Sequence, residues 1–403
     1  MIKAAILGFG TVGGGTAEVL TKNKDIITRR AGQEIELKYI LCRKPRPDSF
    51  FADRIVHDFE TIVNDPEVSV VAECIGGATV AYDYDKRCLL AGKSVVTANK
   101  ELVAKHGMEL TGLARRNNVN FLFEASVGGG IPILRPINQC LAANEISGVC
   151  GILNGTTNYI LTEMIQCGKS FDQALAEAQE KGYAELDPTA DVEGIDAGRK
   201  TAILADLCFG KNVPVEQVRT TGITKISPAD IEYARILGYK IKLLGRALRT
   251  GPNSVTAFVE PHLVSMSNPL ANVDGVMNGV SIKGDAVGQA MFFGPGAGAL
   301  PTASAVAADM IDCARDPSAR NYTGWWPSEP GYVTDPDLLS CRWMVRTTAD
   351  LGSIGTAFGR VRFASSPNMS PDEYAFVTGY MARKELDALT DGMDIRSVYR
   401  MMD

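Results

Sequence analysis

Residues 2–13 read IKAAILGFGTVG, a short apolar run followed by a glycine-rich turn. The apolar run Ile2–Leu7 predicts a buried strand, and the segment from Thr11 to Thr21 predicts a helix directly after it. The turn between them matches GxGxxG in the strand–turn–helix setting that this motif requires. Its glycines would allow a tight turn, close approach of a pyrophosphate, and close packing of helix on strand. The stretch therefore predicts dinucleotide binding, and the alternative is a glycine-rich turn without a ligand. The motif consists of Gly8, Phe9, Gly10, Thr11, Val12 and Gly13.

Outward from this stretch, the first 130 residues alternate strand-like and helix-like segments. The predicted strands lie at 35–42, 68–74, 94–97 and 120–123, and the predicted helices at 82–91 and 107–117. This alternation is typical of a Rossmann-type, doubly wound parallel sheet covered by helices. We therefore expect an α/β fold in which residues 1–130 form the NAD(P)-binding domain.

After residue 130 helical and strand patterns mix, which predicts an α+β substrate domain over 131–320. Its expected helices are 133–143, 158–166, 171–181, 194–209 and 230–244, and its expected strands are 146–153, 254–264 and 276–282. A helix near 301–315 is expected to return to the first domain. The proline-rich residues 316–336 predict a linker. A small third module is expected over 337–403, with strands at 340–348, 373–381 and 395–401 and a helix at 383–389.

The composition favours a small-molecule enzyme over other classes. The 403 residues carry a net charge of −6 with both signs interspersed, which gives no basic footprint for nucleic acid or a membrane surface. The nine cysteines are scattered and never form CxxC, which argues against a disulfide framework or a zinc site. No apolar stretch approaches the length of a transmembrane helix. We expect a cytoplasmic protein.

A run of carboxylates followed by two cations is the segment that most clearly suggests acid–base chemistry. Residues 185–200 contain Glu185, Asp191, Asp196 and Lys200, and the last two lie four apart, on one face of the predicted helix. A lysine placed there can donate a proton to a developing alkoxide, whereas the alternative is a surface ion pair of little energetic value. Together with the dinucleotide motif, the run suggests a substrate with an amino group and a reducible carbonyl.

Basic residues follow the second predicted strand, at the place where an acidic residue would hold a ribose hydroxyl. Arg43 and Lys44 are suited to a 2′-phosphate, so NADP is favoured over NAD; the alternative is a solvated basic loop. Thr97 and Lys100 follow another strand, at the edge of the sheet where ligands of such folds bind.

Two glycine-containing turns each allow two interpretations. Residues 124–132 (EASVGGGIP) could hold a small hard cation through backbone carbonyls, or could only connect two domains. Residues 154–158 (NGTTN) could cap the following helix, or could offer free N–H groups to a substrate carboxylate.

Six motifs in order resemble the homoserine dehydrogenase family over residues 1 to about 320. They are GFGTVG, TANKEL, EASVGGGIPI, GILNGTTNYIL, YAELDPTADVEGIDAGRK and FFGPGAGALPTASAV. The resemblance implies NAD(P)-dependent interconversion of L-aspartate 4-semialdehyde and L-homoserine, in threonine, methionine and isoleucine biosynthesis. It also implies a homodimer or homotetramer.

The resemblance also implies roles for individual residues. Lys200 matches the family's proton donor and Lys100 its second active-site lysine. Glu185 and Asp196 match residues that hold the substrate, with Asp191 close by. The family's sodium-binding turn matches Glu124, Val127, Gly129 and Ile131, mostly through backbone oxygens. Gly296 and Gly298 fall where the family's chain returns to the cofactor.

The third module resembles an ACT domain, a βαββαβ regulatory module that senses threonine in many members of the family. Residues 349–354 lack the usual Pro-Gly turn, and the segment up to residue 371 looks short for a full helix and strand. We therefore expect a degenerate ACT-like module, and the sequence leaves threonine regulation open.

Two other functions are compatible with parts of this sequence. A semialdehyde dehydrogenase that forms an acyl-enzyme needs an activated cysteine, and the sequence offers none in a catalytic setting. A non-catalytic nucleotide-sensing protein on the same fold predicts loss of the lysine–carboxylate set, which this sequence retains.

Overall fold

The computed structural model describes residues 1–320, 324–365, 370 and 372–402. The chain forms two compact units. Unit 1 contains residues 1–147, 202–215 and 282–329, and unit 2 contains residues 148–201, 216–281 and 330–403. The division at residues 130 and 337 expected from the sequence differs from these boundaries, and residues 321–323 of the expected linker lie outside the described residues. No helix in the described part of the chain combines the length and the apolar character needed to cross a bilayer.

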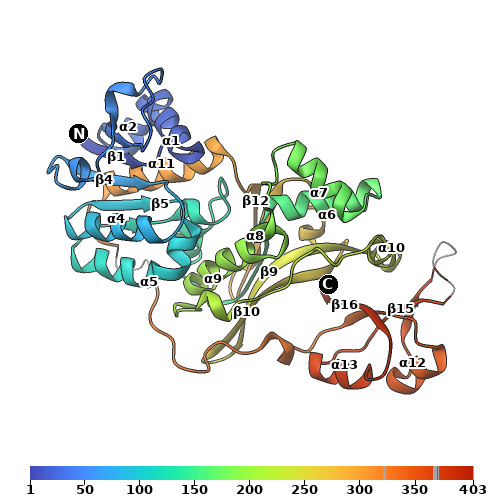
Figure 1. Cartoon of the computed structure of the whole chain (residues 1–403). Helices are drawn as coiled ribbons and strands as arrows, with labels where there is room; N and C mark the ends of the chain where they lie inside the picture. Colours follow the sequence, from blue (N-terminus) through green and yellow to red (C-terminus); the bar gives the residue numbers. More distant parts are fainter. Residues whose placement is uncertain (321–323, 366–369, 371, 403) are drawn as a thin grey trace. The chain divides into compact units, whose positions relative to one another are not determined.

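Unit 1 contains a parallel six-stranded sheet in the order β3-β2-β1-β4-β5-β6. This is the strand order of a dinucleotide-binding doubly wound sheet, so the predicted Rossmann-like α/β architecture is confirmed. Helices α4 and α5 cover one face, and α1, α2 and α11 cover the other (Figure 1). Its elements are β1 (Ile2–Leu7), α1 (Thr11–Lys22), α2 (Lys24–Ala31), β2 (Ile35–Leu41), β3 (Ile55–Val56), α3 (Glu60–Val63), β4 (Val68–Glu73), α4 (Thr79–Leu90), β5 (Ser94–Thr97), α5 (Lys100–Arg116), β6 (Phe121–Leu122), β12 (Gly288–Pro295) and α11 (Ala299–Arg315).

Helix α11 is distant in sequence from the first sheet but shares its core. Its residues Val306 and Met310 are buried in one cluster with Ile6, Val70 and Val96. The approach of α11 to α1 is close because α1 has no side chain at Gly15, where a Cβ atom would lie 2.8 Å from the carbonyl oxygen of Ala299. Helix α11 therefore completes the core of the Rossmann-like domain.

The second sheet has ten strands, most of them in unit 2, in the order β12-β11-β7-β9-β10-β16-β13-β15-β14, with β8 paired to β10. Strands β9 and β10 form a long antiparallel pair, and β16 runs parallel beside β10. The elements outside the C-terminal module are β7 (Ile146–Ile152), α6 (Gly155–Cys167), α7 (Phe171–Glu180), α8 (Thr189–Val192), α9 (Ile195–Phe209), β8 (Arg219–Thr220), α10 (Pro228–Leu237), β9 (Tyr239–Gly251), β10 (Ser254–Ser265) and β11 (Met277–Gly284).

The C-terminal module is more complete than the sequence suggested. Its order is β13 (Trp343–Thr347), α12 (Leu351–Phe358), β14 (Arg362–Ala364), β15 (Tyr374–Val377), α13 (Arg383–Leu389) and β16 (Ile395–Met402), a βαββαβ arrangement. The expectation that residues 349–371 were too short for a helix and a strand was therefore wrong. Asp350 caps α12 by accepting the amides of Gly352 and Ser353, so the helix begins without a Pro-Gly turn.

Two predicted helices differ from the structure for local reasons. The helix expected over 230–244 is α10, which ends at Gly238 in the left-handed conformation (φ 87°), after which the chain continues as β9. The helix expected over 133–143 is a single π-helical turn, Pro136–Cys140, in which the Leu141 amide donates to the Pro136 carbonyl five residues before it. Conversely, α5 begins at Lys100 rather than residue 107, because Asn99 caps it.

We expect the neighbouring glycines of α1 to respond in opposite directions to alanine. Gly15→Ala should lower the free energy of unfolding by about 1–3 kcal/mol, because its Cβ meets backbone of α11. Gly14→Ala should raise it by up to about 1 kcal/mol through helix propensity, since its Cβ would meet only the Phe9 ring, at 3.9 Å. Thermal unfolding of both variants measures this. Equal midpoints would show that the contact between α1 and α11 does not limit stability.

Candidate functional site

A cavity of about 830 Å³ lies in unit 1 at the carboxyl ends of the first strands. This volume falls within the range of small-molecule and cofactor sites. Of the residues predicted to bind a cofactor, the structure brings five together in its lining; the lining that the structure describes does not include Thr11, Val12, Gly13, Thr97, Lys100, Gly296 or Gly298. The five are Gly8, Phe9, Gly10, Arg43 and Lys44.

The glycine turn fits a phosphate-bearing ligand. Gly8 has a φ of 95°, and a Cβ atom there would lie 2.8 Å from the carbonyl oxygen of Cys74. Gly13 allows α1 to start directly above Gly8, because a Cβ would lie 1.9 Å from the Gly8 carbonyl oxygen. Gly10 is the N-cap of α1 and has no side chain to cap the first-turn amides. Such amides, at the positive end of the helix dipole, are suited to a phosphate.

Sequence reasoning missed Glu73, which holds two loops at the edge of the sheet. Its side chain is buried at the end of β4, accepts the amide of Ile75 at 2.5 Å, and accepts the Thr97 hydroxyl at 2.6 Å. Burial raises the pKa of Glu73, while these hydrogen bonds act in the opposite direction. The Asn99 amide donates to the carbonyl of Gly77, which lines the cavity. Thr97 therefore acts on the loops through Glu73. The sequence feature that indicates this role of Glu73 is a carboxylate at the end of an apolar strand.

In unit 2, Lys200 lies in a buried polar cluster. The side chain belongs to α9 and is 8% exposed. Its Nζ donates to the Leu153 carbonyl and to Asp196 Oδ2, both at 2.7 Å. The pair is four residues apart on one helical face, as the sequence predicted. Because both partners are buried, this pair differs from the surface ion pair considered as the alternative.

Asn154 connects this pair to a second carboxylate. Its Nδ2 donates to Asp196 at 2.9 Å and to Asp191 at 2.6 Å, and its Oδ1 caps α6 by accepting the amide of Thr157. The capping interpretation of the NGTTN turn is therefore confirmed, and Asn154 also holds the two carboxylates in place. Glu185 lies apart on an exposed segment, where its backbone carbonyl accepts a hydrogen bond from Gln179.

The turn over residues 124–131 is held by the buried carboxylate of Glu124. Oε1 accepts the amides of Ile133 and Leu134, and Oε2 accepts the amide of Arg135. Burial raises the pKa of Glu124, and these amides act against that shift. Any cation in this turn would therefore rely on backbone oxygens.

The end of β12 packs directly on the same turn. Val127 and Ile131 are buried, and a Cβ atom on Gly129 would lie 2.5 Å from the carbonyl oxygen of Gly296. Gly298 (φ 120°) is the N-cap of α11. Gly296 and Gly298, where the chain is expected to return to the cofactor, thus lie between this turn and α11.

We expect Asn154 substitutions to separate its two structural roles. Asn154→Ala should lower the free energy of unfolding by about 2–3 kcal/mol, because it removes the helix cap and the donors to two carboxylates. Asn154→Ser keeps an N-cap oxygen, so it should recover about 1 kcal/mol of that loss. Urea unfolding of the three proteins measures both effects. Stabilities of both variants within about 0.5 kcal/mol of the parent would contradict this role for Asn154.

Comparison with known proteins agrees with this geometry. The family described as homoserine dehydrogenase matches residues 132–311, and the one described as homoserine dehydrogenase, NAD binding domain, matches residues 8–124. The homoserine dehydrogenase of Pseudomonas aeruginosa is 46% identical over 344 residues, covering 84% of this chain and 77% of its own length. That of Bacillus subtilis is 42% identical over 313 residues, covering 77% and 73%.

Solved structures extend the similarity to the whole chain. A homoserine dehydrogenase from Thiobacillus denitrificans has a TM-score of 0.91 and 36% identity, covering all of this chain and 98% of its own. A hyperthermophilic archaeal homoserine dehydrogenase in complex with NADPH has a TM-score of 0.68 and 28% identity, covering 79% of this chain and 99% of its own. The two family matches, the identities and the shared architecture show that this chain belongs to the homoserine dehydrogenase family.

Proposed function

We propose that this protein interconverts L-aspartate 4-semialdehyde and L-homoserine with a nicotinamide cofactor, in threonine, methionine and isoleucine biosynthesis. The observation that carries the proposal is the buried hydrogen-bonded set of Lys200, Asp196 and Asn154. It supplies a fixed proton donor within a carboxylate-rich site. A nucleotide-sensing protein without catalysis has no need of such a set.

The cluster has the charge expected for an amino-acid substrate. Asn154 donates to two carboxylates, Asp191 and Asp196, and only one ammonium, that of Lys200, pairs with them through Asp196, so the set carries one excess negative charge. This charge is complementary to the ammonium of the substrate. Asp191, Asp196 and Glu185 would hold that ammonium and so fix the position of the carbonyl, which is the orienting part of catalysis.

Lys200 would act on the carbonyl oxygen. When bound, the reduced nicotinamide supplies the hydride that reduces the carbonyl carbon. Lys200 Nζ donates a proton to the oxygen as negative charge develops there, and in the reverse direction it accepts that proton. The Leu153 carbonyl and Asp196 hold the amine in place. Lys100, the first residue of α5, would be the second lysine of the active site.

NADP is the favoured cofactor in this proposal. Arg43 and Lys44 are exposed just beyond β2 and line the cavity that contains the glycine turn. Two cations at this position are suited to a 2′-phosphate, which NAD lacks. The NADPH complex of the archaeal homologue supports the same assignment.

A sodium ion would be held by backbone oxygens of residues 124, 127, 129 and 131, since the Glu124 carboxylate already accepts three amides. The βαββαβ order supports an ACT-like C-terminal module. We also propose a homodimer or homotetramer. The nine free thiols support a reducing, cytoplasmic location.

The first experiment is homoserine-dependent reduction of NADP⁺ by the purified protein and by Lys200→Ala. We expect turnover in the parent and a loss of about 10²–10⁴-fold in kcat for the variant, because the proton donor is removed. The Kd for NADPH should stay within about twofold, since Lys200 does not belong to the nucleotide cavity.

Lys283→Ala is the matched control, because this lysine is exposed and distant in sequence from the cluster. Its turnover should equal that of the parent. An undiminished kcat in Lys200→Ala would remove Lys200 from the mechanism. Absence of turnover in the parent, despite NADPH binding, would instead favour nucleotide sensing.

The double variant Arg43→Ala/Lys44→Ala tests the cofactor assignment. We expect its KM for NADP⁺ to rise about tenfold or more while its KM for NAD⁺ changes less than twofold, because only NADP⁺ carries the phosphate. Arg29→Ala, an exposed change on α2, is the control. Equal increases for both cofactors would show that the two cations do not read the phosphate.

A further inference from the structure

A second cavity, of about 470 Å³, lies within unit 2 and belongs to no part of the proposed active site. The C-terminal module forms one wall through β13, α13 and β16. The other wall comes from β8, β10 and the loop over residues 221–226. Trp343 and Tyr399 contribute largely buried aromatic surface. Its volume is within the range of small-molecule sites.

Basic side chains outnumber acidic ones in the lining, and two carboxylates just outside it, Asp335 and Asp394, pair with Arg219 and Arg396. Five basic side chains and three acidic side chains line the cavity, an excess of two positive charges in a protein whose net charge is −6. The acidic members are Glu260, Asp337 and Asp387. The basic members are Arg219, Lys225, Arg383, Arg396 and Arg400.

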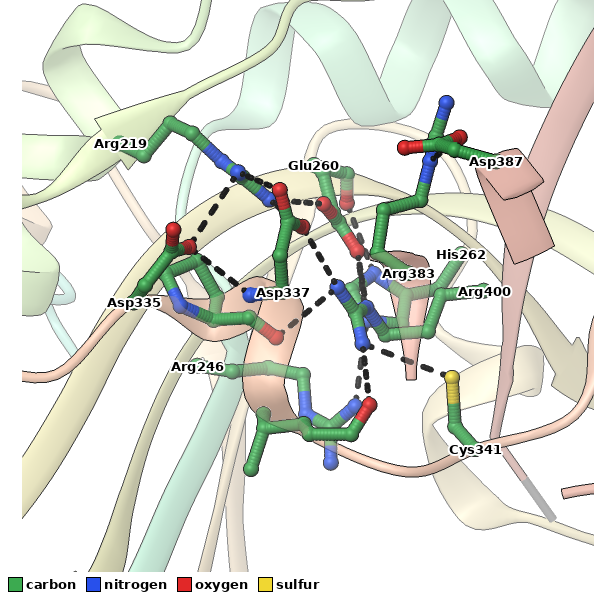
Figure 2. Close-up of polar contacts among 12 residues, drawn as sticks. Arg219, Arg246, Glu260, His262, Asp335, Asp337, Cys341, Arg383, Asp387 and Arg400 are labelled. Carbon is green, nitrogen blue, oxygen red and sulfur yellow. Dashed lines mark hydrogen bonds and ion pairs between the residues drawn. The ribbon is translucent and has the colours of Figure 1, made fainter. Parts of the chain in front are cut away.

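Two of the acidic side chains neutralise buried or half-buried arginines of the wall. Arg400 is 2% exposed and its Nε donates to Glu260 at 2.6 Å. Arg219 makes two hydrogen bonds to Asp337, at 2.6 and 2.7 Å. Figure 2 shows these four side chains as one connected network. This network therefore contributes structure but no net charge.

The neighbouring imidazole adds no charge to the network. His262 is fully buried, and Nε2 lies 3.1 Å from a guanidinium nitrogen of Arg246. Burial, together with the positive charges of Arg246 and Arg400, holds the pKa of His262 well below its usual value. Since the ring is neutral, it adds nothing to the excess positive charge of the lining.

The remaining lining charges lie nearer to solvent. Arg383 pairs with Asp387 at 2.7 Å on α13, as Figure 2 also shows. Arg396 pairs at 2.9 Å with Asp394, which is not a lining residue, and its side chain is 49% exposed. Lys225 is exposed on the opposite wall. Lys225, on the loop over residues 221–226, and Arg396, on β16, thus line the same cavity from two different elements.

The loop that carries Lys225 contacts the segment over residues 191–196, which carries Asp191 and Asp196. The Ile223 amide donates to the Val192 carbonyl at 2.9 Å, and the Thr224 hydroxyl donates to Glu193 at 3.1 Å. A Cβ atom at Gly222 would lie 2.2 Å from the Val192 carbonyl oxygen, so the two segments are in close backbone contact. Val192 directly follows Asp191, and Asp196 is the second residue of α9, the helix that carries Lys200.

We propose that this cavity binds a small polyanion, a molecule bearing carboxylate or phosphate groups, between Lys225 and Arg396. Its binding restrains the loop over residues 221–226 and, through Val192, the turn that carries Asp191 and Asp196. The cavity is then an effector site in contact with the substrate side of unit 2. The binding step does not rest on the proposed function, whereas the consequence for turnover does.

The test is isothermal titration of the full chain, saturated with NADPH so that the nucleotide cavity is filled. Citrate and inorganic phosphate are the two probes, at constant ionic strength set with KCl because exposed charges are screened by salt. We expect at least one of them to bind with a Kd below about 1 mM. Binding of citrate alone assigns carboxylate recognition, and binding of phosphate alone assigns phosphate recognition.

The variant Lys225→Ala/Arg396→Ala should weaken that binding about tenfold or more, because charge-assisted hydrogen bonds are lost. Lys384→Ala is the matched control, since this exposed lysine belongs to α13 but does not line the cavity. Its affinity should equal that of the parent. An unchanged unfolding midpoint in the double variant shows that the cavity wall is intact.

Hydrogen exchange measures the connection between the cavity and residues 187–200 without an activity assay. We expect the bound anion to slow exchange in peptides covering residues 187–200 and 221–226 of the parent and not of the double variant. The proposal is overturned by absence of saturable binding, by equal affinity in the double variant, or by binding without protection of residues 187–200. A failed dehydrogenase assay would leave these measurements unaffected.

Discussion

The buried ammonium of Lys200 needs partners, and the arrangement of unit 2 around it follows from that need. An uncompensated buried charge costs several kcal/mol, so α9 places Asp196 one turn before Lys200, and the end of β7 brings the Leu153 carbonyl to its Nζ. The next residue, Asn154, starts α6 and fixes Asp196 and Asp191 at the same time. One polar contact set thus joins strand, cap and helix, and the same set provides the proton donor of the proposed reaction.

Unit 1 meets a different constraint, which is the close approach of backbone segments. Gly8, Gly13 and Gly15 each occupy a place where a Cβ atom would meet a carbonyl oxygen within 3 Å. These approaches put α1 directly above β1 and let α11 return to the sheet. Glu73 then ties the loop after β4 to Thr97 at the end of β5. Apart from Gly8, these residues shape the cavity without lining it.

The C-terminal module continues the mixed sheet, because β16 pairs with β10. Arg400 fixes this junction through Glu260 and through its position over the Trp343 ring, at 4.4 Å from the ring centroid. The sequence suggested a degenerate module because residues 349–354 lack a Pro-Gly turn. Asp350 supplies a cap instead, and α12 and β14 complete the βαββαβ order. Turn chemistry can be met by more than one residue type, so the missing pattern was weak evidence for a missing helix.

The sequence by itself determined the parallel sheet of unit 1, the glycine turn and the family, because alternating apolar runs and a motif of fixed spacing are local properties. It also placed Asp196 and Lys200 on one helical face, since that relation depends only on helical period. Only the tertiary structure decided that Asn154 joins these residues to Asp191, that Glu73 organises the cavity loops, and that residues 239–251 form a strand after Gly238. Each of these depends on which segments distant in sequence become neighbours, and on the requirement that a buried polar group finds a partner.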